Sequence, residues 1–117
     1  MLNRETVKPW KPSFKGGDTL HFLLIISNPR MLRHMKGVAE AARRRRHRVT
    51  VFFNEESVKL LLEHGVLRDV KAEMLACVTA CEYSGIRQQD MVRGARMTSL
   101  GEIVTLMETC DRTLFMG

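Results

Sequence analysis

The sequence has no apolar run near the roughly 20 residues that a membrane-spanning helix requires. Its longest apolar stretch, residues 20–26, has only the length of a β-strand. The N-terminal stretch MLNRETVKPWKPSFKGG is basic, but it has neither the apolar core nor the cleavage site of a secretory signal. From these absences we expect a cytoplasmic protein.

Cysteine is scarce, and the three cysteines fit a disulfide framework poorly because their number is odd. The cytosol also keeps thiols reduced. Cys77 and Cys81 are four positions apart, which is not the CxxC spacing of zinc ribbons or thioredoxins. They would supply only two of zinc's ligands, and no histidine lies at a metal-type spacing.

Glycine-rich phosphate-binding motifs are missing too. We therefore predict neither a metal nor a cofactor.

Acidic residues are outnumbered, so that the net charge is +6. Five of the 19 basic residues fall in one run, Arg43–Arg48. Such a run can bind RNA or another polyanion through phosphate contacts. However, it contains none of the aromatic residues on which single-stranded nucleic acids stack. We interpret it as a solvated helix end that complements the helix dipole, with docking of an acidic partner as the alternative.

The length of 117 residues indicates one domain. Residues 1–19 hold two of the three prolines, the only tryptophan and the pair Gly16-Gly17, without any sustained periodicity. We expect this segment to be an N-terminal tail that is flexible or contacts a neighbouring subunit. The domain itself is then expected over residues 20–117.

Along the chain, short apolar runs of strand length alternate with segments of helical periodicity. This pattern predicts five strands with helices between them. The strands are expected over residues 20–27, 48–54, 72–78, 95–98 and 112–116. Helices are expected over 29–46, over a short segment after Asn54, from Thr79 to Gly85, and after Ser99, with one further turn over 88–92. This order predicts a three-layer α/β/α domain with a mainly parallel sheet.

Several helix ends and apolar faces carry specific signals. Asn28 is a predicted N-cap, and Thr79-x-x-Glu82 and Ser99-x-x-Glu102 have the spacing of capping boxes. Gly65 is expected just after a C-cap. The second helix is expected to turn Val58, Leu61 and Leu62 inward, and the last helix has an apolar stripe of Leu100, Ile103, Val104, Met107 and Cys110.

Cys77 falls where ligands and reactive groups gather in parallel sheets, beyond the carboxyl end of a strand. If Thr79 caps the next helix, Cys81 lies in its first turn and Cys77 just before it. The partial positive charge there favours the thiolate, which is the nucleophilic form. The alternative is that both are small buried residues, as free cysteines often are. A redox pair, which needs Cα atoms within about 7 Å, also stays open.

The ordered combination of LACVTACEYSGI, with Gly85 eight positions after Cys77, then DMVRGARM and SLGEIVTLMETCDRTLFM, resembles the DsrE/DsrF/TusD-like small sulfur-relay family, also called the DsrE-like family. The resemblance implies a mainly parallel five-stranded sheet and assembly into homotrimers, hexamers or hetero-oligomers of related subunits. It also implies a sulfurtransferase-like carrier that accepts sulfane sulfur as a persulfide on Cys77 and exchanges it with donor and acceptor proteins.

The chain departs from this family in two places. Some relatives have a CxxC motif, whereas Cys81 comes one position later, so it is either an auxiliary thiol or a core residue. The loop after the first strand, Ser27-Asn28-Pro29, is also short. The alternative function is an oligomeric interaction or regulatory subunit without thiol chemistry, which binds acidic partners or RNA through Arg43–Arg48.

Overall fold

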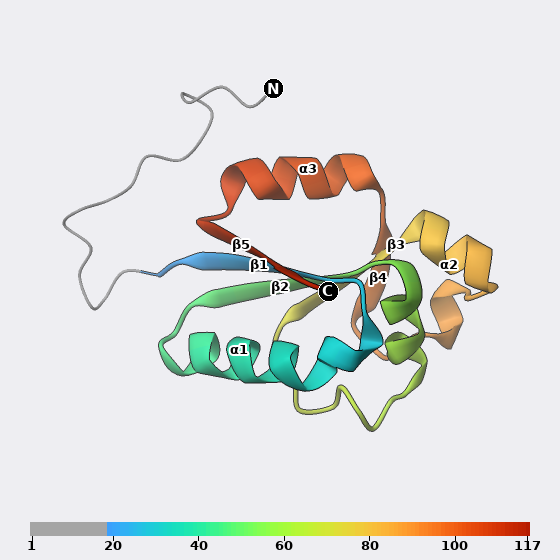
Figure 1. Cartoon of the computed structure of the whole chain (residues 1–117), viewed down its shortest axis with the longest axis horizontal. Helices are drawn as coiled ribbons and strands as arrows, with labels where there is room; N and C mark the ends of the chain where they lie inside the picture. Colours follow the sequence, from blue (N-terminus) through green and yellow to red (C-terminus); the bar gives the residue numbers. More distant parts are fainter. Residues whose placement is uncertain (1–18) are drawn as a thin grey trace.

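The computed structural model describes residues 19–117, in which five strands form one parallel sheet of order β4-β3-β2-β1-β5 (Figure 1). All four pairs of neighbouring strands are parallel. The strands are β1 (His21–Ile26), β2 (Arg48–Phe53), β3 (Glu73–Cys77), β4 (Ala95–Thr98) and β5 (Arg112–Met116). The predicted α/β fold with a five-stranded parallel sheet is therefore confirmed. The predicted tail lies outside the described residues except for Thr19.

Helices cover both faces of the sheet, as the three-layer prediction requires (Figure 1). They are η2 (Pro29–Met31), α1 (Leu32–Arg44), η3 (Glu55–Leu62), α2 (Val78–Ser84), η4 (Gln88–Asp90) and α3 (Leu100–Thr109), where η marks a 3-10 helix. α1 and η3 lie on one face, and α3 lies on the other. In the described part of the chain, none of these helices has the length and apolar character to cross a bilayer.

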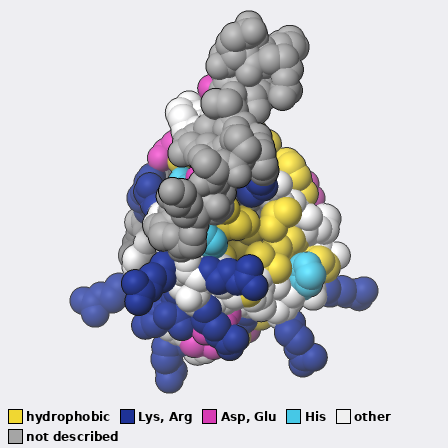
Figure 2. All heavy atoms as spheres, turned by 90° about the vertical axis from the view of Figure 1, so that its left-hand side faces the viewer, with side chains coloured by type: hydrophobic (Ala, Val, Ile, Leu, Met, Phe, Trp, Pro, Cys, Tyr) yellow, Lys and Arg dark blue, Asp and Glu magenta, His cyan; other side chains and the backbone are white. Residues whose placement is uncertain are grey.

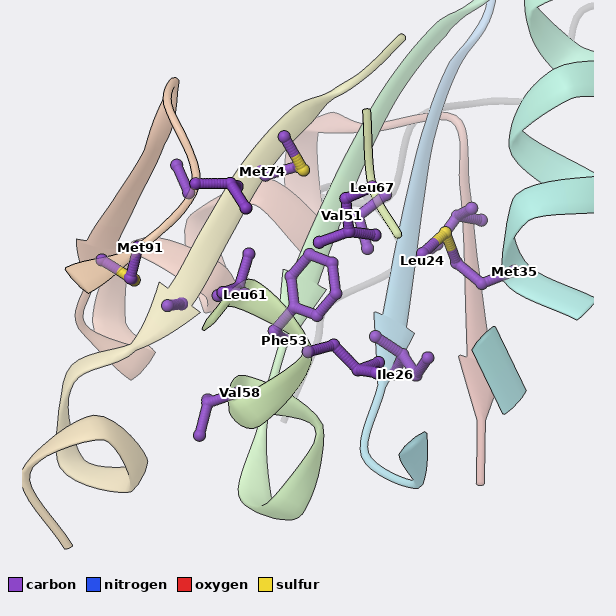
Figure 3. Packing of buried hydrophobic residues seen from close by; sticks show 14 of the residues in the cluster. Leu24, Ile26, Met35, Val51, Phe53, Val58, Leu61, Leu67, Met74 and Met91 are labelled. Atoms are coloured by element: carbon purple, nitrogen blue, oxygen red, sulfur yellow. The ribbon is translucent and has the colours of Figure 1, made fainter. Parts of the chain in front are cut away.

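The core is divided by the sheet into two clusters, because successive strand residues point to opposite faces. The larger cluster, on the side of α1 and η3, includes Leu24, Ile26, Val51, Phe53, Val58 and Leu61 (Figure 3). The smaller cluster, on the side of α3, consists of Leu23, Ile25, Phe52, Leu75, Cys77, Ile103 and Cys110. Burial on both faces explains why the central strands are continuous apolar runs rather than alternating ones.

The segment from Asn28 begins as predicted and ends earlier than predicted. The Asn28 side chain accepts a hydrogen bond from the Arg30 amide (2.9 Å), with Pro29 in the first helical position. α1 ends at Arg44 rather than Arg46. Arg46 adopts a left-handed conformation (φ 64°), which stops the helix and turns the chain towards β2.

The predicted inward face of the second helix was partly wrong. Val58 and Leu61 are buried as expected, but Leu62 is exposed and Leu60 is buried in its place. The segment is a 3-10 helix, in which residues three apart lie above one another, so the buried face follows a period of three. The predicted C-terminal role of Gly65 was also wrong, because the helix has already ended at Leu62.

α3 has the predicted cap but not the predicted burial. The Ser99 hydroxyl accepts a hydrogen bond from the Glu102 amide (3.3 Å). Ile103 and Cys110 are buried, whereas the other three residues of the apolar stripe are exposed: Leu100 (57%), Val104 (54%) and Met107 (37%). Within residues 19–117, α3 is the one long helix on its face of the sheet, so its flank has no neighbouring helix to cover it.

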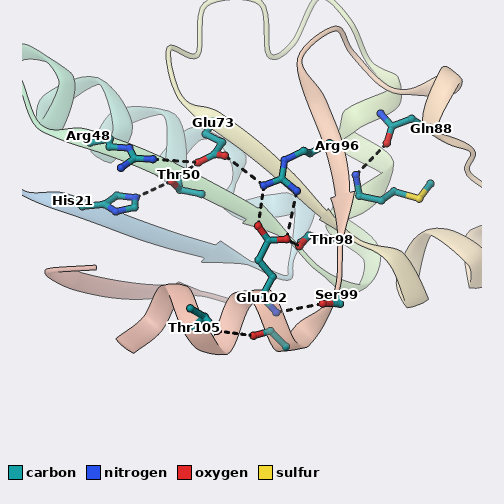
Figure 4. Close-up of polar contacts among 12 residues, drawn as sticks. His21, Arg48, Thr50, Glu73, Gln88, Arg96, Thr98, Ser99, Glu102 and Thr105 are labelled. Carbon is teal, nitrogen blue, oxygen red and sulfur yellow. Dashed lines mark hydrogen bonds and ion pairs between the residues drawn. The ribbon is translucent and has the colours of Figure 1, made fainter. Parts of the chain in front are cut away.

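Polar side chains, rather than a second helix, cover part of the sheet on the side of α3 (Figure 4). The hydroxyl of buried Thr50 donates to Glu73 (3.1 Å) and contacts the His21 ring (2.8 Å). Arg96 lies between the carboxylates of Glu73 (3.7 Å) and Glu102 (2.9 Å). These contacts pair the polar groups of β1 to β4 and of α3 with one another, on the side of the sheet that also carries the smaller apolar cluster.

Glu102 makes the stability of this network dependent on pH. Hydrogen bonds from Arg96 and then from Thr98 lower the pKa of Glu102 from 4.5 to about 2. A depressed carboxyl pKa stabilises the fold above the unfolded value, so this stabilisation is lost as pH falls from about 4.5 towards 2. We expect Glu102→Gln to reduce the loss of stability over that interval, measured by thermal unfolding from pH 6 downwards. Glu108→Gln, on the same helix, is the control. Equal acid sensitivity of the wild type and Glu102→Gln would contradict this prediction.

Candidate functional site

A cavity of about 460 Å³ lies at the carboxyl edge of the sheet, beside the end of β3. It is formed by the segment after β2, by α2 and by the start of α3, which all leave the sheet at this edge. Its lining residues are Asn54, Glu55, Glu56, Cys77, Thr79, Ala80, Tyr83, Ser84 and Leu100. This is the edge at which the sequence predicts a reactive group.

Cys77 is the last residue of β3, the N-cap of α2 and a lining residue of this cavity. It is 4% exposed, and its side chain belongs to the cluster on the side of α3. No side chain caps α2, so no side-chain acceptor occupies the N–H groups of its first turn. Cys77 is thus the residue at which α2 starts, and its thiol itself accepts no capping hydrogen bond from these N–H groups.

The predicted capping box Thr79-x-x-Glu82 was wrong. α2 begins at Val78, so Thr79 is already inside its first turn. The strand leads directly into the helix, because Cys77 has extended backbone angles and serves as the N-cap. The predicted end of the helix is confirmed, since Gly85 adopts a left-handed conformation (φ 72°) that favours glycine.

The side chains of Cys81 and Cys77 lie on opposite sides of the sheet. It is fully buried and packs in the larger cluster, on the side of α1 and η3. Burial, and to a lesser degree the neighbouring Cys77, raises the pKa of the Cys81 thiol. Both cysteines are free thiols. The structure thus gives Cys81 the surroundings of a packing residue, not those of an activated thiol.

Cys110 is buried at the end of α3, as the sequence predicts. Its Sγ lies 3.2 Å from the Thr113 hydroxyl and 3.4 Å from the Arg112 carbonyl oxygen. It lines none of the described cavities. These contacts fix Cys110 as part of the small core beneath α3.

The wall of the cavity opposite α2 is held by hydrogen bonds around Ser57. The hydroxyl of this fully buried serine donates to the Ile26 carbonyl oxygen (2.6 Å) and accepts from the Asn54 amide (2.9 Å). The Asn54 side chain in turn accepts from the Glu55 amide (2.8 Å). These bonds anchor the segment after β2 to the end of β1, and so fix one side of the cavity.

Sequence reasoning missed the residues that surround Cys77. Glu55 and Glu56 line one side of the cavity, and exposed Tyr83 and Leu100 line another. The sequence could have predicted Glu55 and Glu56, because they follow a predicted strand whose carboxyl end lies at the same edge of the sheet as Cys77. Nothing in the sequence indicates that Tyr83 and Leu100 lie beside Cys77, since their positions depend on where α2 and α3 begin.

The surroundings of Cys77 supply few groups for a metal or a phosphate. Among residues 19–117, no three His, Cys, Asp or Glu side chains come together as a possible metal site. The cavity contains one thiol, two exposed carboxylates and an apolar rim. This arrangement suits chemistry at a single sulfur atom next to a surface where another molecule can dock.

Comparison with known proteins relates the chain to others through its fold alone. The sequence matches no protein-family model and no curated protein. The fold is similar to the crystal structure of the ychN protein from E. coli, with a TM-score of 0.67 and 13% identity over 83% of this chain and 99% of that one. It is also similar to MTH1491, a protein of unknown function from Methanobacterium thermoautotrophicum, with a TM-score of 0.55 and 17% identity over 74% of this chain and 90% of that one. These similarities show that the chain shares its α/β fold with both proteins.

Proposed function

We propose that the protein is a DsrE-like sulfur carrier, with Cys77 holding sulfane sulfur as a persulfide for sulfur oxidation or sulfur-transfer metabolism. The observation that carries this proposal is the position of Cys77, the one cysteine of the chain that lines the cavity at the carboxyl edge of the sheet. The DsrE-like fold supports it. We also propose that the protein is cytoplasmic, because the cytosol keeps reduced the free thiols on which such a carrier depends.

The proposed transfer needs no cofactor. The Cys77 thiolate attacks the outer sulfur of a donor persulfide, and a new S–S bond forms as the donor's S–S bond breaks. The donor leaves as its thiolate, so sulfane sulfur moves without net oxidation or reduction. An acceptor thiolate then attacks the outer sulfur of Cys77–S–SH, which releases the Cys77 thiolate. The first-turn amides of α2 would stabilise the anionic sulfur in both steps.

The other two cysteines are less suitable for this step. Cys81 is enclosed by the larger core cluster, and its raised pKa disfavours the thiolate. Cys110 lies beneath α3, in contact with Thr113. We therefore propose that Cys77 acts alone, and that Cys81 contributes packing rather than an auxiliary thiol.

Intact mass spectrometry after incubation with polysulfide tests this proposal. We expect the wild type to gain the mass of one sulfur atom, removable by dithiothreitol, and Cys77→Ser to gain none. Cys81→Ala and Cys110→Ala are the controls and are expected to gain sulfur like the wild type. A gain in Cys77→Ser, or no gain in the wild type, would refute the assignment.

We further propose that copies of the chain, or of related subunits, assemble through α3 and β5. The exposed apolar residues of α3 are accompanied by Phe115 of the edge strand β5, which is 69% exposed. Large apolar side chains that stay exposed on neighbouring elements are typical of protein–protein interfaces. A trimer or hexamer would cover Val104, Met107 and Phe115, while Tyr83 and Leu100 at the cavity rim would meet the sulfur donor or acceptor.

A further inference from the structure

The arginine run is not one surface in the folded protein. Arg43 and Arg44 occupy the last turn of α1, where both contact Glu40. Arg48 begins β2 and lies 4.0 Å from Glu73, in the polar network on the side of α3. The run is therefore divided between different parts of the molecule, and it cannot bind a ligand as one continuous stripe.

The structure instead joins part of the run to cations from elsewhere in the sequence. Two clefts, of about 540 and 280 Å³, lie on either side of Val70, which lines both. The larger lies between α1 and residues 69–71, and the smaller lies between residues 64–70 and residues 92–93. Six cationic side chains line this double cleft: Lys36, Arg43, Arg44, Arg68, Lys71 and Arg93.

Only two carboxylates accompany these six cations. Glu40 contacts Arg43 and Arg44, and Asp69 lies 3.0 Å from Lys36. These contacts lower the pKa of both carboxyls, by hydrogen bonds to Arg43 and Arg44 for Glu40 and to Lys36 for Asp69. All these pairs are solvent-accessible, and exposed ion pairs of this kind contribute little to stability. An incoming anion can therefore displace the carboxylates at small cost. Figure 2 shows basic side chains gathered around carboxylates at the end of the molecule where α1 finishes.

We propose that the double cleft binds the phosphate backbone of a nucleic acid without reading its bases. Phosphates are contacted mainly by Lys and Arg, and such contacts are independent of sequence. Neither cleft is lined by Phe, Tyr or Trp, so the clefts offer no such aromatic ring on which a base could stack. The two clefts lie next to each other at Val70 and spread their six cations over both, which suits a chain of phosphates better than a single one.

An acidic protein suits this surface less well. Protein interfaces have an apolar, aromatic-rich core, with charged residues at the rim. The larger cleft has only Ala39 and Val70 as apolar lining, and Ala39 is almost fully buried. The smaller cleft has more apolar lining, but its Leu67, Met74 and Val92 are buried and offer a partner little surface. Among residues 19–117, the exposed large apolar side chains lie elsewhere, on η3, α2, α3 and β5. The inference is independent of the proposed sulfur chemistry, because Cys77 lines neither cleft.

Fluorescence anisotropy with a labelled single-stranded RNA of mixed sequence tests the inference on the full chain. Three to four phosphate contacts predict a slope of log K against log salt of about −2 to −3, or a loss of roughly 30-fold between about 50 and 200 mM salt. Arg44→Gln/Lys71→Gln is expected to weaken binding at least about tenfold and to reduce the slope by about 1.4.

The matched control is Arg30→Gln/Arg112→Gln, which removes the same charge from exposed positions outside both clefts. It is expected to weaken binding less than about twofold. Absence of RNA binding at low salt, or equal weakening by the two double variants, would overturn the inference. Tighter binding of a polyglutamate peptide than of RNA would overturn it in favour of an acidic protein partner. Circular dichroism of each variant establishes that it is folded.

Discussion

Replacing Phe53 by alanine is expected to lower the free energy of unfolding by about 3–5 kcal/mol. Phe53 is fully buried in the larger cluster, at the end of the central strand β2 (Figure 3). Its ring lies among side chains of β1 and η3, including Ile26 and Leu61. Alanine would lose the transfer free energy of the ring and leave a cavity, because these neighbours belong to rigid elements that relax only partly.

Urea unfolding followed by circular dichroism measures this effect, since the midpoint shifts with stability while the slope stays constant. Tyr83→Ala is the matched control, because Tyr83 is an aromatic residue on the surface. It is expected to change stability by less than about 0.5 kcal/mol. Similar losses in the two variants would mean that the larger cluster does not dominate the stability of the fold. The measurement includes refolding from urea at low temperature, which also covers the case of a variant that is mostly unfolded in water.

Replacing Val104 by glutamate is expected to convert the proposed assembly into single chains. Val104 lies at the centre of the exposed apolar face of α3, between Leu100 and Met107, and is 54% exposed. A glutamate there costs the single chain little, since its carboxylate stays in water. In an interface, the same carboxylate would be buried without a partner, which costs several kcal/mol per copy. Each 1.4 kcal/mol lowers the association constant about tenfold.

Analytical ultracentrifugation of the wild type and the variant at equal concentration measures this change. Thr105→Glu is the matched control, because it adds the same charge at the next position of α3, on an exposed surface away from the apolar stripe. It is expected to leave the assembly unchanged. A wild type that sediments as a single chain at micromolar concentration, or an unchanged assembly in Val104→Glu, would contradict the proposed interface.

Much of the fold could be predicted because the strands carry strong local signals. The apolar run of β1 and the turn signals after it, Asn28 and Pro29, place a strand and a helix within a few residues of their observed limits. The sequence also located Cys77 correctly, at the carboxyl end of β3. Each of these features depends on neighbours within a few residues, which a single sequence displays directly.

The errors arose where one residue type fits two structures. Thr79 has the spacing of a cap, but Cys77 takes that role because β3 leads directly into α2. Leu62 is as apolar as Leu61, and only the 3-10 geometry of η3 turns it outward. In both cases the local pattern was compatible with the prediction, and the surrounding structure chose the alternative.

The sequence by itself determined the α/β class, the parallel sheet and the edge at which Cys77 lies, because hydrophobic periodicity and turn residues encode these locally. Only the tertiary structure separated Cys77 from Cys81. Cys77 ends a strand and Cys81 lies within a helix, so their side chains lie on opposite sides of the sheet although the two residues are close in sequence. It also left the apolar stripe of α3 exposed and divided the arginine run. Periodicity shows that a face is apolar or basic, but what lies against that face depends on contacts between residues far apart in the chain.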